Sequence, residues 1–420
     1  MNFTTYHPED EAHQQRVTIN ESDKLGSGAT ATVYKAKYRG KSVAAKIYDN
    51  AGRANASKLS AMLVNPPNSI SRTIDGRDYP QLAWPISILL NDSGSTTGYL
   101  MPIVDVTRSF PLDNYYDRAL LRRFRSRDEG ALSFKLEIAR NLTGLIADLH
   151  KHEHYFIDVK PQNIRVFRNT HYVVLLDCDG FSISGKSERY PAELVSTDYI
   201  SPEATNKKMR PAEMGERQDC YALAVILFQL LNNGTHPYQG IPVSVGSISA
   251  ANTNDEKAAA GLYPHGTKKH ALILPRPQSV HHLWDDRTRR LFDRAFMPSS
   301  NARPTAKQWT NHFKTLINEQ ALEGCPKVPK DVDHMRFQGK DCPTCYRAAL
   351  NGSKPKKKNR KIKHTDSVYV FHPTAGKVRR SPPTSRSPQP PGGADISRTP
   401  ALMLAVWIIV ILLLIAVFNG

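Results

Sequence analysis

The sequence predicts an α+β body over about its first 320 residues, followed by segments of a different character. Residues 41–48 (KSVAAKIY) and 171–176 (HYVVLL) have the content and length typical of strands. Residues 221–231 (YALAVILFQLL) are apolar on every face but too short to span a bilayer, so we expect a helix buried in a large core. A further helix is indicated by apolar side chains spaced four, three and four residues apart: Ile138, Leu142, Leu145 and Leu149.

The composition excludes several classes of protein. Hydrophobic residues make up 40% and charged residues 23% of the 420, which excludes a wholly disordered chain. Five cysteines are too few for a secreted disulfide framework and favour a reducing compartment. Residues 1–16 lack the apolar stretch of a signal peptide, and we take them as an N-terminal tail.

The net charge of +18 comes from 57 basic and 39 acidic residues, but it is unevenly placed. Residues 347–400 contain 13 basic and 2 acidic residues. The basic excess therefore belongs mainly to a tail, and we expect no specific binding of nucleic acid by the folded body.

A glycine-containing segment, Leu25–Tyr34 (LGSGATATVY), lies near the start of the body. Gly26 and Gly28 allow a strand-turn-strand to bring backbone amides close to phosphate oxygens. An ordinary hairpin has the same pattern. Lys46, on the strand that follows, makes the combination suitable for an ATP phosphate clamp.

A second cluster of chemically active residues occupies the segment FIDVKPQNIRV, residues 156–166. The carboxylate of Asp158 is able to accept a proton from a hydroxyl nucleophile, and Lys160 to neutralise the γ-phosphate. The side-chain oxygen of Asn163 suits Mg²⁺. Asp177 follows the strand HYVVLL directly and is a second candidate magnesium ligand.

The order and spacing of these elements resemble the eukaryotic-type protein kinase family over about residues 17–320. Ser201-Pro202-Glu203 stands where the family has its APE motif, and Arg303 is placed like the arginine that pairs with its glutamate. Asp219 is placed like the aspartate that orients the catalytic-loop backbone. The resemblance implies a bilobal protein-kinase-like fold.

The same resemblance implies roles for individual residues. Asp158 positions or deprotonates the acceptor hydroxyl, and Lys160 stabilises the transferred phosphoryl group. Asn163 and Asp177 hold Mg²⁺, and Lys46 holds the α- and β-phosphates of ATP. The residues that cover the nucleotide are Leu25, Gly26, Gly28 and Val33. Lys160 and Thr197 resemble the residues of Ser/Thr rather than Tyr kinases.

Several departures from the family pattern bear on function. The third glycine of the loop is Ala31, and the HRD triplet reads Phe156-Ile157-Asp158, without the arginine that binds an activation-loop phosphate. No acidic residue lies between residues 50 and 74, where the helix carrying the partner of Lys46 is expected. Either another acid takes its place, or Lys46 works unpaired, or the enzyme is impaired.

The LDCDGF segment and Trp84-Pro85 resemble a divergent group of bacterial kinases, some with helix-hairpin-helix elements. We identify no such element in this sequence. The resemblance therefore predicts no DNA binding, although kinases of this group often act opposite a PP2C-type phosphatase.

Cysteines and a histidine follow the kinase-like region, in residues 321–350. Cys325, His334, Cys342 and Cys345 have the spacing C-x8-H-x7-C-x2-C, and four N/S ligands suit a closed, structural Zn²⁺ site. Reduced surface cysteines and a redox-active CxxC pair are the alternatives.

The last 70 residues predict a tether and an anchor. Residues 351–400 contain KPKKKNRKIK and RRSPPTSRSPQPPGG, a composition that does not fold, and which is either a plain linker or a site for anionic lipid headgroups. Residues 401–418 form an apolar run about 27 Å long as a helix, which favours a transmembrane tail anchor over a buried core helix. The positive-inside rule then places the kinase domain in the cytoplasm.

The sequence therefore predicts a tail-anchored protein Ser/Thr kinase that uses ATP and Mg²⁺ and acts on a protein substrate. A tail-anchored pseudokinase that binds nucleotide or a partner without phosphoryl transfer is the main alternative. A small-molecule kinase is a weaker one, because the SPE segment and Thr197 resemble a platform for protein substrates.

Overall fold

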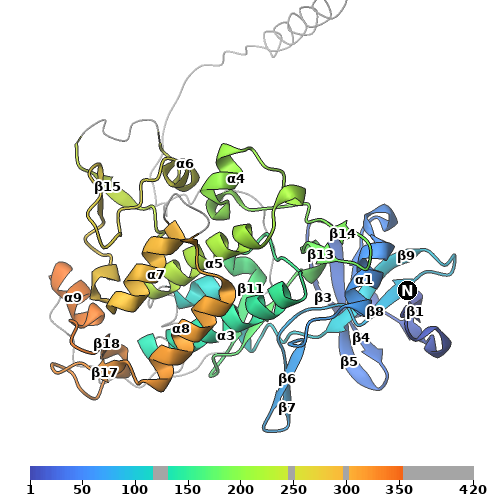
Figure 1. Ribbon diagram of the computed structural model, residues 1–420. Helices are drawn as coiled ribbons and strands as arrows, with labels where there is room; N and C mark the ends of the chain where they lie inside the picture. Colours follow the sequence, from blue (N-terminus) through green and yellow to red (C-terminus); the bar gives the residue numbers. More distant parts are fainter. Residues whose placement is uncertain (117–130, 245–250, 297–301, 353–420) are drawn as a thin grey trace, which may run out of the picture. The chain divides into compact units, whose positions relative to one another are not determined.

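A seven-stranded antiparallel sheet forms the N-terminal part of the computed structural model, which describes residues 1–116, 131–244, 251–296 and 302–352 (Figure 1). Its strands run in the order β2-β1-β8-β9-β5-β4-β3. They are β1 (Asn2–Tyr6), β2 (Arg16–Thr18), β3 (Lys24–Ser27), β4 (Ala31–Tyr38), β5 (Lys41–Tyr48), β8 (Ser87–Leu90) and β9 (Thr96–Pro102). Strand β5 coincides with the predicted strand.

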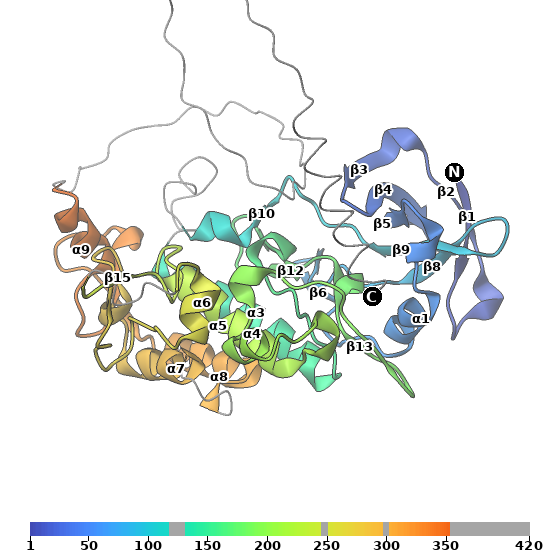
Figure 2. The same cartoon turned by 90° about the horizontal axis from the view of Figure 1, so that it is seen from above.

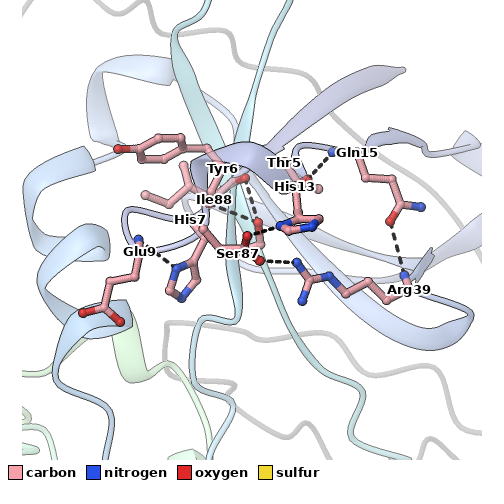
Figure 3. Close-up of polar contacts among 10 residues, drawn as sticks. Thr5, Tyr6, His7, Glu9, His13, Gln15, Arg39, Ser87 and Ile88 are labelled. Carbon is pink, nitrogen blue, oxygen red and sulfur yellow. Dashed lines mark hydrogen bonds and ion pairs between the residues drawn. The ribbon is translucent and has the colours of Figure 1, made fainter.

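The first residues form part of this sheet, which corrects the prediction of an N-terminal tail over residues 1–16. Strand β1 pairs with β2 on one side and with β8 on the other, and Phe3 and Thr5 are buried. Figure 3 shows the polar contacts that fix this region, including Ser87 Oγ donating to the Tyr6 carbonyl at 3.1 Å. The alternation of NFTTY is too short to mark a strand in the sequence, but pairing on both sides stabilises it.

One helix, α1 (Ala56–Val64), lies beside the sheet and contacts β8 and β13. Its N-terminus is capped by the Asn55 side chain, which accepts from the Lys58 amide at 2.9 Å. The indole of Trp84 donates to the Met62 carbonyl at 3.0 Å and ties α1 to the segment before β8. A small hairpin of β6 (Ser71–Ile74) and β7 (Arg77–Pro80) follows α1.

The remainder of the described chain is mainly helical (Figures 1 and 2). Its α-helices are α3 (Leu132–Lys151), α4 (Pro202–Asn206), α5 (Glu216–Leu231), α6 (Asn254–Ala259), α7 (Asp286–Phe296), α8 (Ala306–Asn318) and α9 (Pro343–Leu350). Its strands are β10 (Ser109–Pro111), β11 (Ile164–Phe167), β12 (Val173–Leu175), β13 (Ile183–Ser184), β14 (Arg189–Tyr190), β15 (Gly240–Pro242), β16 (Ile273–Pro275), β17 (Leu322–Gly324) and β18 (Met335–Phe337). A sheet of many strands followed by a bundle of helices agrees with the mixed α/β content expected of a bilobal kinase fold.

Helix α5 is the centre of the helical part. Residues 218–228 of it are buried throughout, as the apolar run in the sequence predicted. The Phe228 ring packs edge-on against Trp284, Phe292 and Phe296, with centroids 5.2–5.9 Å apart. The buried face of α3 is the predicted one and includes Ile138, Leu142, Leu145 and Leu149.

Residues 321–350 fold into a short hairpin, a single 3₁₀ turn (Val332–His334) and α9. Strand β18 contacts α3, and Lys340 pairs with Asp286 on α7 at 3.1 Å. The predicted linker from residue 353 onward and the predicted anchor at 401–418 lie outside the described residues. Among the residues that are described, no helix has the length and apolarity needed to cross a membrane.

Candidate active site

The loop before β11 brings three of the predicted residues together. Lys160 Nζ lies 2.5 Å from Asp158 Oδ2, and the Asn163 amide nitrogen donates to the Asp158 carbonyl at 3.2 Å. The other carboxylate oxygen, Asp158 Oδ1, is shielded from solvent and has no hydrogen-bond partner among the described residues. A buried oxygen without a partner is suited to accept a hydroxyl proton.

Asp219 at the start of α5 holds the backbone of this loop. Its carboxylate is fully buried and accepts from the amides of Phe156 and Ile157, each at 2.7 Å. Ile157 has a φ of +60°, a region that a β-branched residue rarely adopts. Hydrogen bonds to a charged acceptor offset this backbone strain, and they fix the residue that directly precedes Asp158.

Asp177 lies where strand β12 ends, as predicted. The amide of Leu176 donates to the Asn163 carbonyl at 2.8 Å, which joins the backbones beside both candidate magnesium ligands. The Asp177 side chain is 66% exposed. Because the Asn163 amide nitrogen faces Asp158, its oxygen is left for a ligand, and two oxygen donors fit a hard cation such as Mg²⁺.

Lys46 reaches the same place from β5. Its ammonium group lies 3.3 Å from Asp177 Oδ1 and 2.7 Å from Asp179 Oδ1. Burial alone lowers the pKa of Lys46, but the charges of Asp179 and Asp177 outweigh burial and raise it above its ordinary value. The sequence left the acidic partner of Lys46 open, and the structure identifies it as Asp179.

The glycine-containing segment is the hairpin of β3 and β4. The amide of Gly28 donates to the Ala31 carbonyl at 2.8 Å, and an added Cβ at Gly26 would meet nothing within 4 Å. Val33 lies opposite Gly26 on β3 and opposite Lys46 on β5. Leu25 is 46% exposed. All four residues predicted to cover the nucleotide therefore belong to the hairpin beside the Lys46 strand.

The segment between Asp177 and Glu203 is ordered by contacts of its own. Strands β13 and β14 form a hairpin, and the Arg189 guanidinium lies over the Tyr155 ring at 4.5 Å. Ile157 stands where the family has a phosphate-binding arginine. It is buried in an apolar cluster with three other side chains: Ala192, Ala204 and Met214. Apolar packing thus takes the place of a phosphate anchor.

The end of this segment carries the predicted ion pair. Arg303 donates to both carboxylate oxygens of Glu203, at 2.5 and 3.1 Å. Burial raises the pKa of Glu203, but the bonds and charge of Arg303 lower it overall. A bidentate arginine–carboxylate pair at this position fixes α4 to the helical part.

The four predicted metal ligands of residues 321–350 also converge. Their ligand atoms lie within 4.8 Å of one another, and Cys325, His334 and Cys342 are buried. Cys325 Sγ is 3.7 Å from Cys345 Sγ, and His334 Nδ1 is 3.3 Å from Cys345 Sγ and 3.6 Å from Cys342 Sγ. A tetrahedral Zn²⁺ with Zn–S bonds of about 2.3 Å separates two sulfurs by about 3.8 Å, so these residues fit a metal ion of that size.

Three residues beside Lys46 were not predicted from the sequence as part of the site: Asp179, Tyr48 and Tyr99. Tyr48 is two residues from Lys46 on one strand, so the two side chains share a face. That spacing was a usable signal. Tyr99 is brought opposite Lys46 only by the pairing of β5 with β9, which the sequence does not reveal.

Comparisons with known proteins find similarity to protein kinases. The protein kinase domain family matches residues 114–313, which begins after the glycine hairpin and Lys46. "Protein kinase YegI" from Escherichia coli K12 is 30% identical over 328 residues, covering 77% of this chain and 48% of that protein. The protein of the same name from Escherichia coli O157:H7 is 29% identical over 336 residues, 78% of this chain and 48% of its own length. The chain thus spans about half the length of these two relatives.

Proposed function

We propose, from its similarity to the protein kinase domain family and to a protein kinase of Escherichia coli, that this chain is an active Mg-ATP-dependent protein Ser/Thr kinase. The observation that carries the proposal is the convergence of Asp158, Lys160, Asn163 and Asp177 with Lys46. The main reason to favour a pseudokinase was the missing helix acid. The ion pair of Lys46 with Asp179 supplies a different acid for this lysine, which supports an active enzyme.

In this mechanism each residue acts on ATP or on the acceptor hydroxyl. Asp158 Oδ1, buried and without a partner among the described residues, accepts the hydroxyl proton or orients the hydroxyl. Lys160 beside it balances charge on the transferred phosphoryl group, and Lys46 holds the nonreacting phosphates. Asn163 and Asp177 would hold Mg²⁺, which neutralises phosphate charge when bound. Lys160 and Thr197 support Ser/Thr acceptors through the family resemblance.

The test is transfer of labelled phosphate from Mg-ATP by the full chain in mild detergent, with a generic basic protein as acceptor. Asp158→Asn should abolish labelling of the acceptor and of the chain itself. Asp92→Asn is the matched control, because the Asp92 side chain is 79% exposed and its replacement should change nothing. Phosphoserine or phosphothreonine in the product supports the proposal. Phosphotyrosine, or equal labelling by the Asp158 variant, contradicts it.

We further propose that Cys325, His334, Cys342 and Cys345 bind one structural Zn²⁺ ion. The closed set of four ligands leaves no open position for chemistry, so the ion would hold residues 321–350 together as a folded unit. The purified chain should carry about one equivalent of zinc. Cys342→Ser should remove it and lower the melting temperature, whereas Cys220→Ala, at a buried cysteine of α5, should retain it. A metal-free chain with an unchanged melting temperature would contradict the site.

We also propose that residues 401–418 anchor the chain in a membrane with the kinase domain in the cytoplasm. The support is the uninterrupted apolar run and the basic segment before it. Deleting 401–418 should move the chain from the membrane pellet to the soluble fraction. A full chain that stays soluble without detergent argues against the anchor. The proposed partners are a protein acceptor and, by family resemblance, a PP2C-type phosphatase of opposite action.

A further inference from the structure

The buried ammonium group of Lys46 requires an opposite charge, and the helix that follows its strand does not provide one. Helix α1 contains no acidic residue. Instead its buried face carries Lys58, which is 8% exposed. Lys58 Nζ donates to the Pro191 carbonyl at 3.3 Å, so α1 is tied to the segment after Asp177 by a cation. Burial lowers the pKa of Lys58 to about 8, although the nearby charges of Asp179 and Glu193 act to raise it.

Asp179 is held in place by three donors. Its Oδ1 atom accepts from Lys46 Nζ at 2.7 Å and from the Tyr99 hydroxyl at 2.8 Å, and its Oδ2 atom accepts from the Tyr48 hydroxyl at 2.8 Å. The side chain of Asp179 is only 14% exposed. A carboxylate that accepts three hydrogen bonds from fixed donors has little freedom to move.

The donors around Asp179 all belong to the sheet. Lys46 and Tyr48 lie two residues apart on β5, and Tyr99 on β9 is directly opposite Lys46. The two tyrosine rings are 6.3 Å apart and line the space around the lysine. The carboxylate therefore binds a rigid three-residue face of the sheet rather than a helix.

Asp177 and Asp179 differ in solvent exposure and in their distance from Lys46. Asp177 lies farther from Lys46, at 3.3 Å, and is 66% exposed, so it is accessible to an ion. Asp179 is closer, at 2.7 Å, and enclosed. One carboxylate is thus available for the nucleotide's metal while the other remains with the lysine.

We propose that Asp179 is the positioning residue of Lys46, clamped by Tyr48 and Tyr99, so that the ion pair that aims Lys46 at the ATP phosphates is independent of α1. This inference rests on the proposed kinase function and deepens it. In this arrangement α1 contributes no hydrogen-bonded partner to the Lys46 pair.

The test is a double-mutant cycle between Lys46 and Asp179 in the full chain in detergent. The variants are Asp179→Asn, Lys46→Met and the two combined. The kcat and the KM for ATP are measured for each, along with Mg-ATP affinity, which needs no turnover. Asp179→Asn should lower kcat/KM for ATP by roughly 100-fold through a misplaced lysine. In the Lys46→Met background it should add less than about a twofold loss, because Asp179 acts only through Lys46.

The outcomes separate this inference from the proposed function. An Asp179→Asn variant with unchanged kcat/KM and affinity, or with the same loss whether or not Lys46 is present, overturns it. If the wild type transfers no phosphate, the proposed function fails, and the affinity cycle still decides the role of Asp179.

A milder variant serves if Asp179→Asn shows no cooperative thermal unfolding and is therefore not properly folded. Tyr48→Phe removes one of the three donors to Asp179 and should lower kcat/KM for ATP roughly two- to tenfold. This effect should disappear in the Lys46→Met background. A Tyr48→Phe loss that persists there overturns the inference as well.

Discussion

Replacing Asp219 by asparagine should impair both folding stability and catalysis, because this side chain binds the backbone of the loop that carries Asp158. The carboxylate is fully buried and accepts from two backbone amides at 2.7 Å and from His150 Nε2 at 3.0 Å. Asparagine has nearly the same shape but only one acceptor oxygen. The NH2 group of asparagine would face the backbone N–H of either Phe156 or Ile157, and two donors cannot form a hydrogen bond.

The size of the effect follows from the contacts. A hydrogen bond to a charged group contributes about 1.5–3 kcal/mol, and the charge that offsets the strained backbone of Ile157 is also lost. We therefore expect the free energy of unfolding to fall by about 2–4 kcal/mol, and Tm by roughly 3–6 °C. Since Asp158 directly follows Ile157, a displacement of about 1 Å should lower kcat by about 100-fold.

The assay pairs thermal unfolding with kinase activity, and Asp148→Asn is the matched control. Asp148 also accepts a backbone amide, that of Ser69 at 2.8 Å, but it takes no part in holding the catalytic loop. It should lower Tm while leaving kcat within about twofold. If Asp219→Asn stays within about 0.5 kcal/mol of the wild type with normal kcat, the reasoning about the loop is refuted.

Three further predictions follow from single positions. A Cβ on Gly98 would lie 2.1 Å from the Lys46 carbonyl oxygen, so Gly98→Ala should displace β5 and raise the KM for ATP. A Cβ on Gly144 in α3 would meet only an ordinary contact at 3.9 Å. Gly144→Ala should therefore raise the free energy of unfolding by about 0.5–1 kcal/mol. An unchanged KM in purified Gly98→Ala would contradict the first expectation. Burial lowers the pKa of His236 to about 4, although its bond to the Asp198 carbonyl acts to raise it. The unfolded state therefore binds more protons below pH 6.5. This histidine alone should lower the free energy of unfolding by up to about 3 kcal/mol between pH 6.5 and 4, so His236→Gln should reduce the pH dependence of stability in denaturant titrations. An identical slope in the variant would show that other groups cause it.

The sequence predicted the parts of the site that lie close together along the chain. Asp158, Lys160 and Asn163 fall within six residues, so their spacing alone indicated one loop. The partner of Lys46 lies 133 residues away, and an aspartate near another aspartate carries no signal of its own. Asp179 can be identified as this partner only from the structure, which pairs β5 with β9 and places the residues after β12 beside Lys46.

The fold shows the same division. The helix α5 could be predicted because its apolar run is long and buried on every side, and β5 because four buried residues follow one another in a segment typical of strands. Strand β1 was missed because its five residues are stabilised by β8, some 84 residues later, rather than by their own pattern. The strands of the β13–β14 hairpin have only two residues each, which is too short for a periodic apolar pattern to predict them.

The clamp around Lys46 has a consequence for the order of events on the ribosome. Lys46 is synthesised 133 residues before Asp179, which at about 5–20 residues per second is a delay of roughly 7–27 s. Tyr48 and Tyr99 are synthesised during that interval, so strands β5 and β9 can pair before Asp179 has been synthesised. Until then the Lys46 ammonium group has no buried partner and must stay hydrated, so this face of the nascent sheet must stay open to water. Its closure waits for the first residues of the segment after β12.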